Sequence, residues 1–171
     1  MSDSTIRPTG REIRLPEDSY IVSKSDEKGV ITYANRVFMQ VSGYREQELL
    51  GRPHKILRHP EMPRGVFRHL WETIKRGEEC FAFINNLAKN GDHYWVLANV
   101  TPDFDEQHQR ITGYFSCRRL ASRAGIEASA ALYRRMCAME QQGINPAASM
   151  QWMMDEITRE YGSYEKFVLG F

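Results

Sequence analysis

The chain has 171 residues, of which 42% are hydrophobic and 26% charged, and its net charge at pH 7 is +1. A charge so close to zero gives no reason to expect nucleic acid or a membrane surface as the main partner. The three cysteines include no C-x-x-C pair, which indicates reduced thiols in a cytoplasmic protein. No segment approaches the roughly 20 apolar residues that a membrane span needs. The length and composition predict a single domain with an appendage.

The first predicted elements are a polar arm over residues 1–18 and a pair of strands after it. Apolar runs at residues 20–22 and 30–33 flank the sequence DEKG (residues 26–29), whose glycine allows the positive φ of a tight turn. Asn35 follows, and its side chain is placed to cap a short helix that ends at Gly43.

A basic segment, GRPHKILRHPEMP (residues 51–63), precedes a longer predicted helix. Pro63 suits the first turn of that helix, and its apolar positions share one face: Val66, Phe67, Leu70, Trp71 and Ile74. Composition alone favours Arg58 and His59 as surface cations with Glu61 nearby as counter-ion. The alternative is a stiffened grip for an anion, because an arginine offers bidentate donors to phosphate.

Three further strands are predicted at residues 80–88, 93–102 and 110–120, with a type I′ turn at Asn90-Gly91. Together with the first pair they predict an α+β fold, a five-stranded antiparallel sheet with helices on one face. Alternation places Phe81 and Phe83 opposite Ile84, so the strand that carries them is apolar on both sides. The N-terminal arm, the tail or a second copy of the chain should cover its outer side, and we favour the tail or a dimer contact.

Residues 121–171 predict a helical tail. One helix spans residues 122–142, and Asn145-Pro146 opens a second that continues to residue 161. The second helix carries a stripe that must pack on the domain or on a partner: Met150, Met153, Met154, Ile157 and Tyr161.

Three stretches carry a resemblance to a known family: GVITYANRVFMQVSGYREQELLGRPHKILRHPEMP, LWETIKRGE and KNGDHYWVLANVTP. Over roughly residues 18–120 the chain resembles PAS sensory domains, and more narrowly the FAD-binding PAS domain of bacterial aerotaxis receptors. The resemblance implies a PAS domain at residues 19–120 that holds FAD non-covalently between the sheet and the helices. It also implies a cytoplasmic redox or oxygen sensor that acts through a signalling partner.

The cofactor site implied by this resemblance has several parts. Arg58 and His59 would hold the diphosphate of FAD, and Trp71 would form a wall. Cys80 stands where the family carries a pocket tryptophan, and Glu61 stands where it carries an aspartate. The remaining candidate contacts are Asn35, His54, Asn86 and Asn99.

Other functions remain open at this point. One alternative is a cofactor-free PAS module that dimerises or docks, and another is a heme site on His54, His59, His69 or His93. No nucleophile elbow, phosphate-binding loop or metal-binding motif is found, so the chain is not expected to be an enzyme or to bind a metal. A homodimer is expected.

Overall fold

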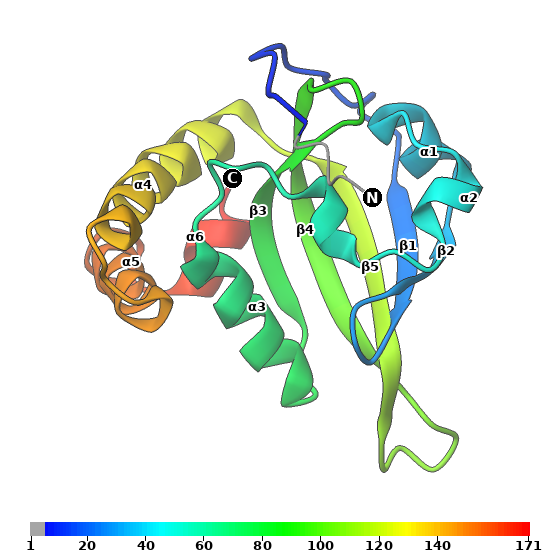
Figure 1. Cartoon of the computed structure of the whole chain (residues 1–171). Coiled ribbons are helices and arrows are strands. Elements are labelled where there is room, and N and C mark those ends of the chain that lie inside the picture. The colour runs from blue at the N-terminus through cyan, green and yellow to red at the C-terminus, as the bar shows by residue number, and fades with distance from the viewer. Residues whose placement is uncertain (1–5) are drawn as a thin grey trace.

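The computed structural model describes residues 6–171 and contains one antiparallel sheet with helices on its inner face and along one edge (Figure 1). The sheet has five strands in the order β2-β1-β5-β4-β3, which confirms the predicted α+β architecture. The strands are β1 (Ile21–Asp26), β2 (Ile31–Ala34), β3 (Cys80–Leu87), β4 (His93–Phe104) and β5 (Ile111–Leu120).

Between β2 and β3 the chain forms the short helices α1 (Arg36–Ser42) and α2 (Glu46–Leu49), a 3₁₀ turn η1 (His54–Leu57) and the longer helix α3 (Arg64–Lys75). These elements lie over the inner face of the sheet (Figure 1). The tail follows β5 as α4 (Arg123–Gln141), α5 (Pro146–Tyr161) and α6 (Tyr164–Leu169).

Local sequence signals account for several element ends. The Asn35 side chain accepts a hydrogen bond from the Phe38 amide at 3.0 Å and caps α1, as predicted. The predicted type I′ turn between β3 and β4 is wrong, because it needs a positive φ at both Asn90 and Gly91. Only Gly91 has one, at 91°, and its amide bonds the Ala88 carbonyl at 2.9 Å. The connection is therefore an ordinary turn closed by a left-handed glycine.

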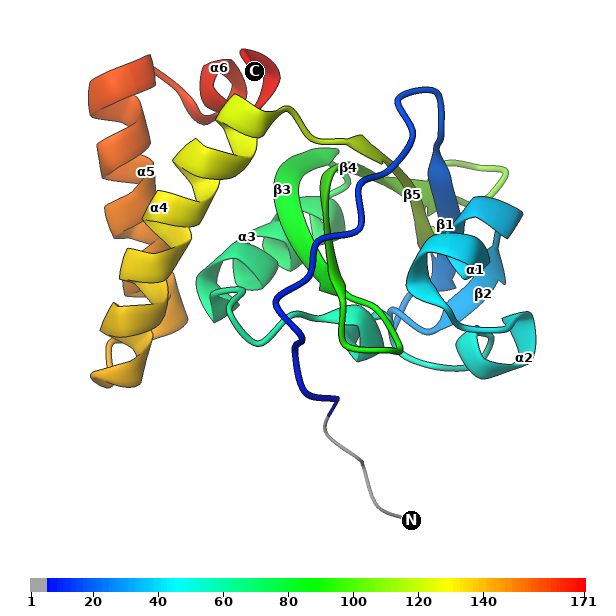
Figure 2. The same ribbon diagram turned by 90° about the horizontal axis from the view of Figure 1, so that it is seen from above.

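The tail covers the outer side of β3, as the two-sided apolar pattern of that strand predicts. Phe83 is 1% exposed and packs against Phe167 and Phe171, with ring centroids 6.2 and 6.4 Å away. The close approach of Gly125 adds to this contact, because a Cβ there would lie 2.5 Å from the Phe83 ring. Figure 2 shows α4 and α5 standing beside α3, at the β3 side of the sheet.

Two tyrosines of the tail form hydrogen bonds to backbone carbonyls at the open edge of β3. The Tyr133 hydroxyl donates to the Phe83 carbonyl at 2.8 Å, and the Tyr164 hydroxyl donates to the Phe81 carbonyl at the same distance. An unpaired strand edge presents free carbonyls, so these bonds replace part of a missing neighbouring strand.

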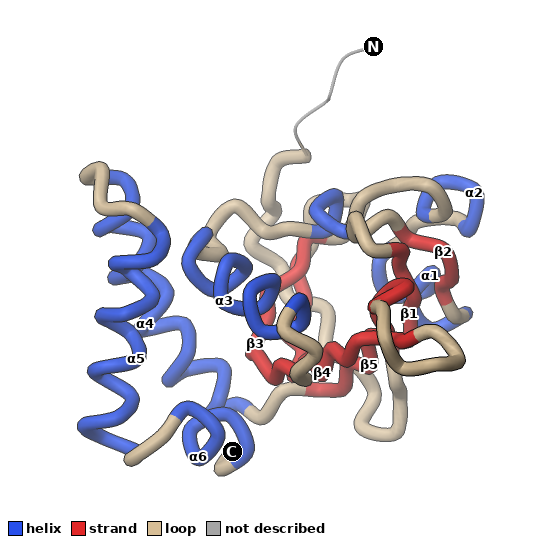
Figure 3. The backbone as a smooth tube through the Cα atoms, turned by 90° about the horizontal axis from the view of Figure 1, so that it is seen from below, coloured by secondary structure: helices blue, strands red, loops and turns tan. Residues whose placement is uncertain are grey.

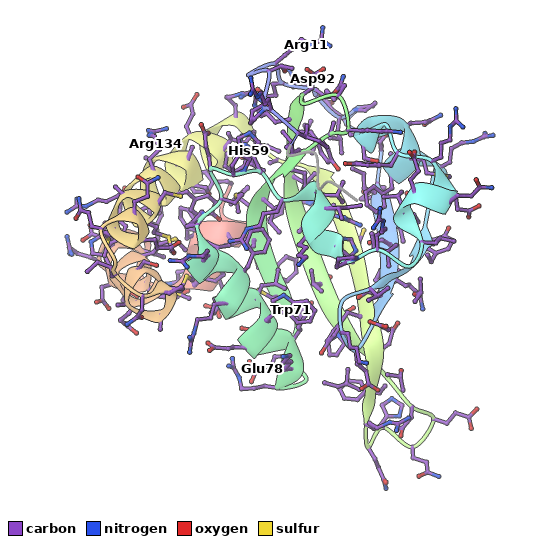
Figure 4. The ribbon with its side chains drawn as sticks, in the orientation of Figure 1. Arg11, His59, Trp71, Glu78, Asp92 and Arg134 are labelled. Carbon is purple, nitrogen blue, oxygen red and sulfur yellow. The ribbon has the colours of Figure 1, made fainter. Side chains whose placement is uncertain are left out.

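The arm before β1 lies along the β3–β4 hairpin. Its backbone bonds His93 on both sides, from Ile13 N to the His93 carbonyl at 2.7 Å and from His93 N to the Arg11 carbonyl at 2.9 Å. Arg11 also forms an ion pair with Asp92 at 2.6 Å, and Figure 4 shows the two side chains together at the hairpin tip. Among residues 6–171, no helix has both the length and the apolar character needed to cross a membrane.

Candidate cofactor cavity

A cavity of about 440 Å³ lies between α3, η1 and the inner face of the sheet. Figure 3 shows how these elements are arranged, with α3 and β3 on one side and β1 on the other. Its walls are largely apolar, with side chains from α3, β3 and β4: Phe67, Leu70, Trp71, Ile74, Ile84, Ala98 and Val100. Trp71 lies on the side of α3 that faces the sheet (Figure 4). The volume suits a small organic ligand.

Arg118, on β5, is the most unusual residue of the cavity wall. It is 5% exposed, its guanidinium lies 4.7 Å from the centroid of the Phe38 ring, and it donates to the Ser23 hydroxyl. None of the described carboxylates forms an ion pair with it, and its Nε has no hydrogen-bond partner. Burial lowers the pKa of this guanidinium to about 10. A buried cation without a counter-charge is expensive, which favours a ligand with acceptor atoms at this end of the cavity.

His54 belongs to the same polar cluster. Its Nε2 lies 3.0 Å from the Ser23 hydroxyl, and its ring stacks on Phe38 at a centroid distance of 6.1 Å. Burial, and then the charge of Arg118, lower the pKa of His54 to about 3. His54 is therefore neutral at physiological pH and can present one donor or one acceptor.

Asn86, near the end of β3, adds a further donor. It is 7% exposed, and its side-chain Nδ2 has no hydrogen-bond partner among residues 6–171. Buried amides in proteins are nearly always hydrogen-bonded. Because Asn86 lines the cavity, a ligand carbonyl or ring nitrogen would satisfy this group.

Arg58 also lines the cavity, at the point where the basic segment approaches β3 through a bridge with Asn86. Its guanidinium lies 4.2 Å from the centroid of the Phe67 ring. Burial lowers the pKa of Arg58, and the nearby Glu140 carboxylate partly offsets this. No acidic residue of the described chain lines the cavity, whereas five basic residues do: Lys28, His54, Lys55, Arg58 and Arg118.

The residues predicted from sequence fall into two groups. His54, Arg58, Trp71 and Asn86 line the cavity, although their contact with a cofactor stays a prediction. The others lie elsewhere.

Three of these others have roles in the protein frame. Asn35 caps α1 and bonds the Val22 amide at 3.1 Å. Asn99 is on the outer face and donates to Glu79 at 3.0 Å. Cys80 is 3% exposed, and burial raises the pKa of its thiol to about 12, so it is not a reactive thiolate.

His59 and Glu61 lie in the loop before α3, outside the cavity wall. His59 is 4% exposed, accepts from the Glu61 amide at 3.2 Å and faces His93 at a centroid distance of 5.7 Å. The Glu61 carbonyl accepts a hydrogen bond from the Cys137 thiol at 3.2 Å.

Sequence reasoning missed Arg118. Tyr114, Ser116 and Arg118 alternate along β5 and all three line the cavity, so the period of the strand places them on one face but does not show that this face is covered. Taken as a pattern, these residues look like the solvated side of a strand. Their burial depends on the helices that close over the sheet.

Comparison with known proteins identifies the class of domain. Residues 31–114 match the sequence profile of a family described as the PAS fold. The chain therefore contains a PAS domain, which confirms the resemblance found in the sequence and supports a signal-sensing role.

More particularly, the chain is 43% identical to the aerotaxis receptor of Escherichia coli (strain K12), over 75% of this chain and 25% of the receptor. It is 29% identical to a nitrogen fixation regulatory protein of Klebsiella pneumoniae, over 61% of this chain and 21% of that protein. The chain thus spans a quarter or less of these two relatives.

A solved LOV domain from an Erythrobacter litoralis blue-light activated histidine kinase shares the fold. It superposes with a TM-score of 0.55 at 22% identity, over 64% of this chain and 100% of that domain.

Proposed function

We propose that this chain is a sensory module that binds FAD non-covalently in the cavity. It reports redox state or oxygen through contacts of its sheet and helical tail with a signalling protein. The single observation that carries the proposal is the cavity itself, which combines apolar walls with buried donors that lack acceptors. The similarity to an aerotaxis receptor supports the choice of ligand.

The residues present fit a flavin. Trp71 and Phe67 supply aromatic surface for a planar ring. The unpartnered Nδ2 of Asn86 and Nε of Arg118 supply donors for the carbonyl and nitrogen atoms at the edge of such a ring. FAD would supply reversible electron transfer when bound. The protein would hold the ring, exclude water from it and place a fixed positive charge beside it.

The tail is coupled to the cavity wall through Glu140 on α4. Its side chain is 6% exposed and accepts from the amides of Arg64 and Gly65, each at 2.9 Å, which are the first two residues of α3. The Ser149 hydroxyl of α5 donates to the same carboxylate at 2.8 Å. Because α3 also forms a wall of the cavity, a shift of α3 on ligand reduction would act directly on this contact.

The remaining parts of the proposal concern the setting. We expect the module to work in the cytoplasm, to turn over no substrate and to signal as a homodimer. The tail already covers Phe83. A dimer would therefore use the outer face around β1 and β2, where Tyr20 and Tyr33 are 52% and 48% exposed. The division into an arm (1–18), a PAS domain (19–120) and a tail (121–171) belongs to the same proposal.

Reconstitution tests the central claim. The purified chain is incubated with excess FAD and desalted, and its absorption spectrum is recorded. We expect the two flavin bands at one FAD per chain. An Ala98→Phe variant, which places a ring on the cavity floor, should lose the bands. Ala124→Phe, on the exposed start of α4, should keep them.

Circular dichroism shows whether both variants are folded. A wild-type chain that stays colourless after incubation with FAD contradicts the proposal. A Soret band would favour the heme alternative, for which His54 is the only one of the four histidine candidates on the cavity wall. The absence of any band together with dimerisation would favour the cofactor-free docking module.

A further inference from the structure

We infer that Lys28 and Lys55 hold the phosphate groups of the bound flavin nucleotide at the mouth of the cavity. This inference rests on the proposed function, because it concerns the same cavity. It assigns the anionic part of the ligand to two lysines that the sequence patterns did not single out.

The backbone brings these two lysines to one rim. Lys28 lies in the β1–β2 turn and Lys55 in η1, and both line the cavity. The two segments are joined directly, because the His54 amide donates to the Gly29 carbonyl at 3.0 Å. The lysines are therefore the immediate neighbours of two hydrogen-bonded residues.

The turn is also held rigidly. The Asp26 carboxylate accepts from the amides of Lys28 and Val30 at 2.8 and 2.9 Å. Gly29 lies against Trp71, since a Cβ there would be 2.7 Å from that indole ring. A rigid rim lowers the entropy cost of holding a ligand group.

Burial locates the mouth. Arg118 is 5% exposed and marks the closed end of the cavity, whereas Lys28 and Lys55 are both exposed. A planar ring that uses the donors at the closed end would leave its charged chain at the lysines. Phosphate needs both counter-charges and water, and the exposed rim provides both.

The positive charges of the two lysines are also not neutralised by a partner within the described residues. Among the described residues, neither Lys28 nor Lys55 forms an ion pair. Arg58, the other cation near the opening, stacks on Phe67 and has the Glu140 carboxylate in its surroundings. Among the described residues of the cavity wall, these two lysines are the exposed cations without an ion pair.

One acidic residue acts against them. Glu27 precedes Lys28 and is exposed. Burial, and then the negative charge of Glu27, raise the pKa of Tyr114, which lines the cavity. Because Glu27 is the neighbour of Lys28 in the same turn, its negative charge would oppose a phosphate held there, and its removal provides a test with the opposite sign.

The experiment compares three flavins that share a ring but differ in charge: riboflavin, FMN and FAD. Their dissociation constants are measured by fluorescence quenching for the wild-type chain and for the Lys28→Gln/Lys55→Gln double variant. We expect the double variant to bind FAD and FMN about tenfold more weakly and riboflavin within about twofold of wild type. Raising the ionic strength from about 0.05 to 0.3 M should reduce this difference.

Two control variants complete the design. Lys24→Gln removes a lysine of β1 that pairs with Asp103 at 3.2 Å and does not line the cavity, and it should leave all three affinities unchanged. Glu27→Gln should tighten FAD and FMN about twofold to threefold without affecting riboflavin.

The failures of the inference and of the proposed function differ. If riboflavin binds but the lysine substitutions leave FAD unaffected, or weaken all three flavins equally, the inference is overturned and the flavin cavity stands. If the wild-type chain binds none of the three flavins, the proposed function fails and the inference fails with it.

Discussion

Helix α3 has two sides with opposite chemistry. On the side of the tail, the Glu140 carboxylate accepts two amides of α3 and the Ser149 hydroxyl. On the side of the cavity, Arg118 and Asn86 keep buried nitrogen atoms without partners. Buried polar groups normally find partners within the protein, so the contact made by Glu140 has the character of a finished interface, whereas the cavity has that of a ligand site.

The energetic contrast follows from the same groups. Hydrogen bonds from amides to the buried Glu140 carboxylate stabilise the docked tail. Burial alone would raise the pKa of Glu140, but these hydrogen bonds outweigh it, so the pKa is lowered. An uncompensated guanidinium destabilises the ligand-free chain, so ligand binding should stabilise the protein by satisfying it.

The largest effect is expected on the side of the tail. Phe83→Ala removes a ring that is 1% exposed between the sheet and α6, and should lower the free energy of unfolding by about 3 to 5 kcal/mol. Phe115→Ala, on the open part of the same sheet face, should cost about 1 kcal/mol or less. Urea unfolding measures both, and equal losses would mean that the tail does not bury Phe83 in solution.

An intermediate effect is expected at Glu140. Glu140→Gln keeps the shape of the side chain but weakens its bonds to the start of α3, and should cost about 2 kcal/mol. The tail should also exchange its amide hydrogens faster, as measured by mass spectrometry. Glu127→Gln, on an exposed part of α4, is the matched control. Unchanged exchange in the tail would contradict the role of Glu140 as its anchor.

The smallest effect, when expressed per pH unit, concerns His54 on the side of the cavity. In the unfolded ligand-free chain His54 takes up a proton near pH 6.5, whereas in the folded chain its pKa is about 3. The unfolded state then binds more protons between these values, so stability falls as the pH drops through this window, by up to about 1.4 kcal/mol per pH unit.

Urea unfolding at about pH 7, 6 and 5 would measure this slope. In His54→Gln the dependence of the free energy of unfolding on pH should be weaker, because unfolding of this variant takes up about one proton fewer. His59 and His69 also have lowered pKa values through burial, and they contribute equally to both proteins. If the free energy of unfolding depends on pH equally in wild type and variant, the pKa of His54 is not lowered in the folded chain, and the prediction is contradicted.

The fold was largely predictable from the sequence because its signals are local. The apolar spacing from Val66 to Ile74, the Asn35 cap and the alternation along β3 each predict an element without reference to the rest of the chain. The type I′ turn was not predictable at this level, because Asn90 uses its side chain to bond the Asp92 amide at 3.0 Å and keeps a negative φ.

The candidate site was only partly predictable, because its decisive features are long-range. The separation between Ser23 and Arg118 is 95 residues, and that between Gly65 and Glu140 is 75. No local pattern distinguishes a buried arginine on a strand from a solvated one. The motif around Arg58 includes residues of the cavity wall. The buried charge, Arg118, is on strand β5 and lies outside that motif.

The two tyrosine hydroxyls bonded to β3 also matter for anyone who shortens the chain. A fragment cut after β5 would leave the carbonyls of Phe81 and Phe83 exposed, next to a phenyl ring stripped of its cover. Such an exposed edge can pair with strands of other molecules. Poor solubility of the shortened domain would then result from the loss of the tail that covers its sheet rather than from a failure to fold.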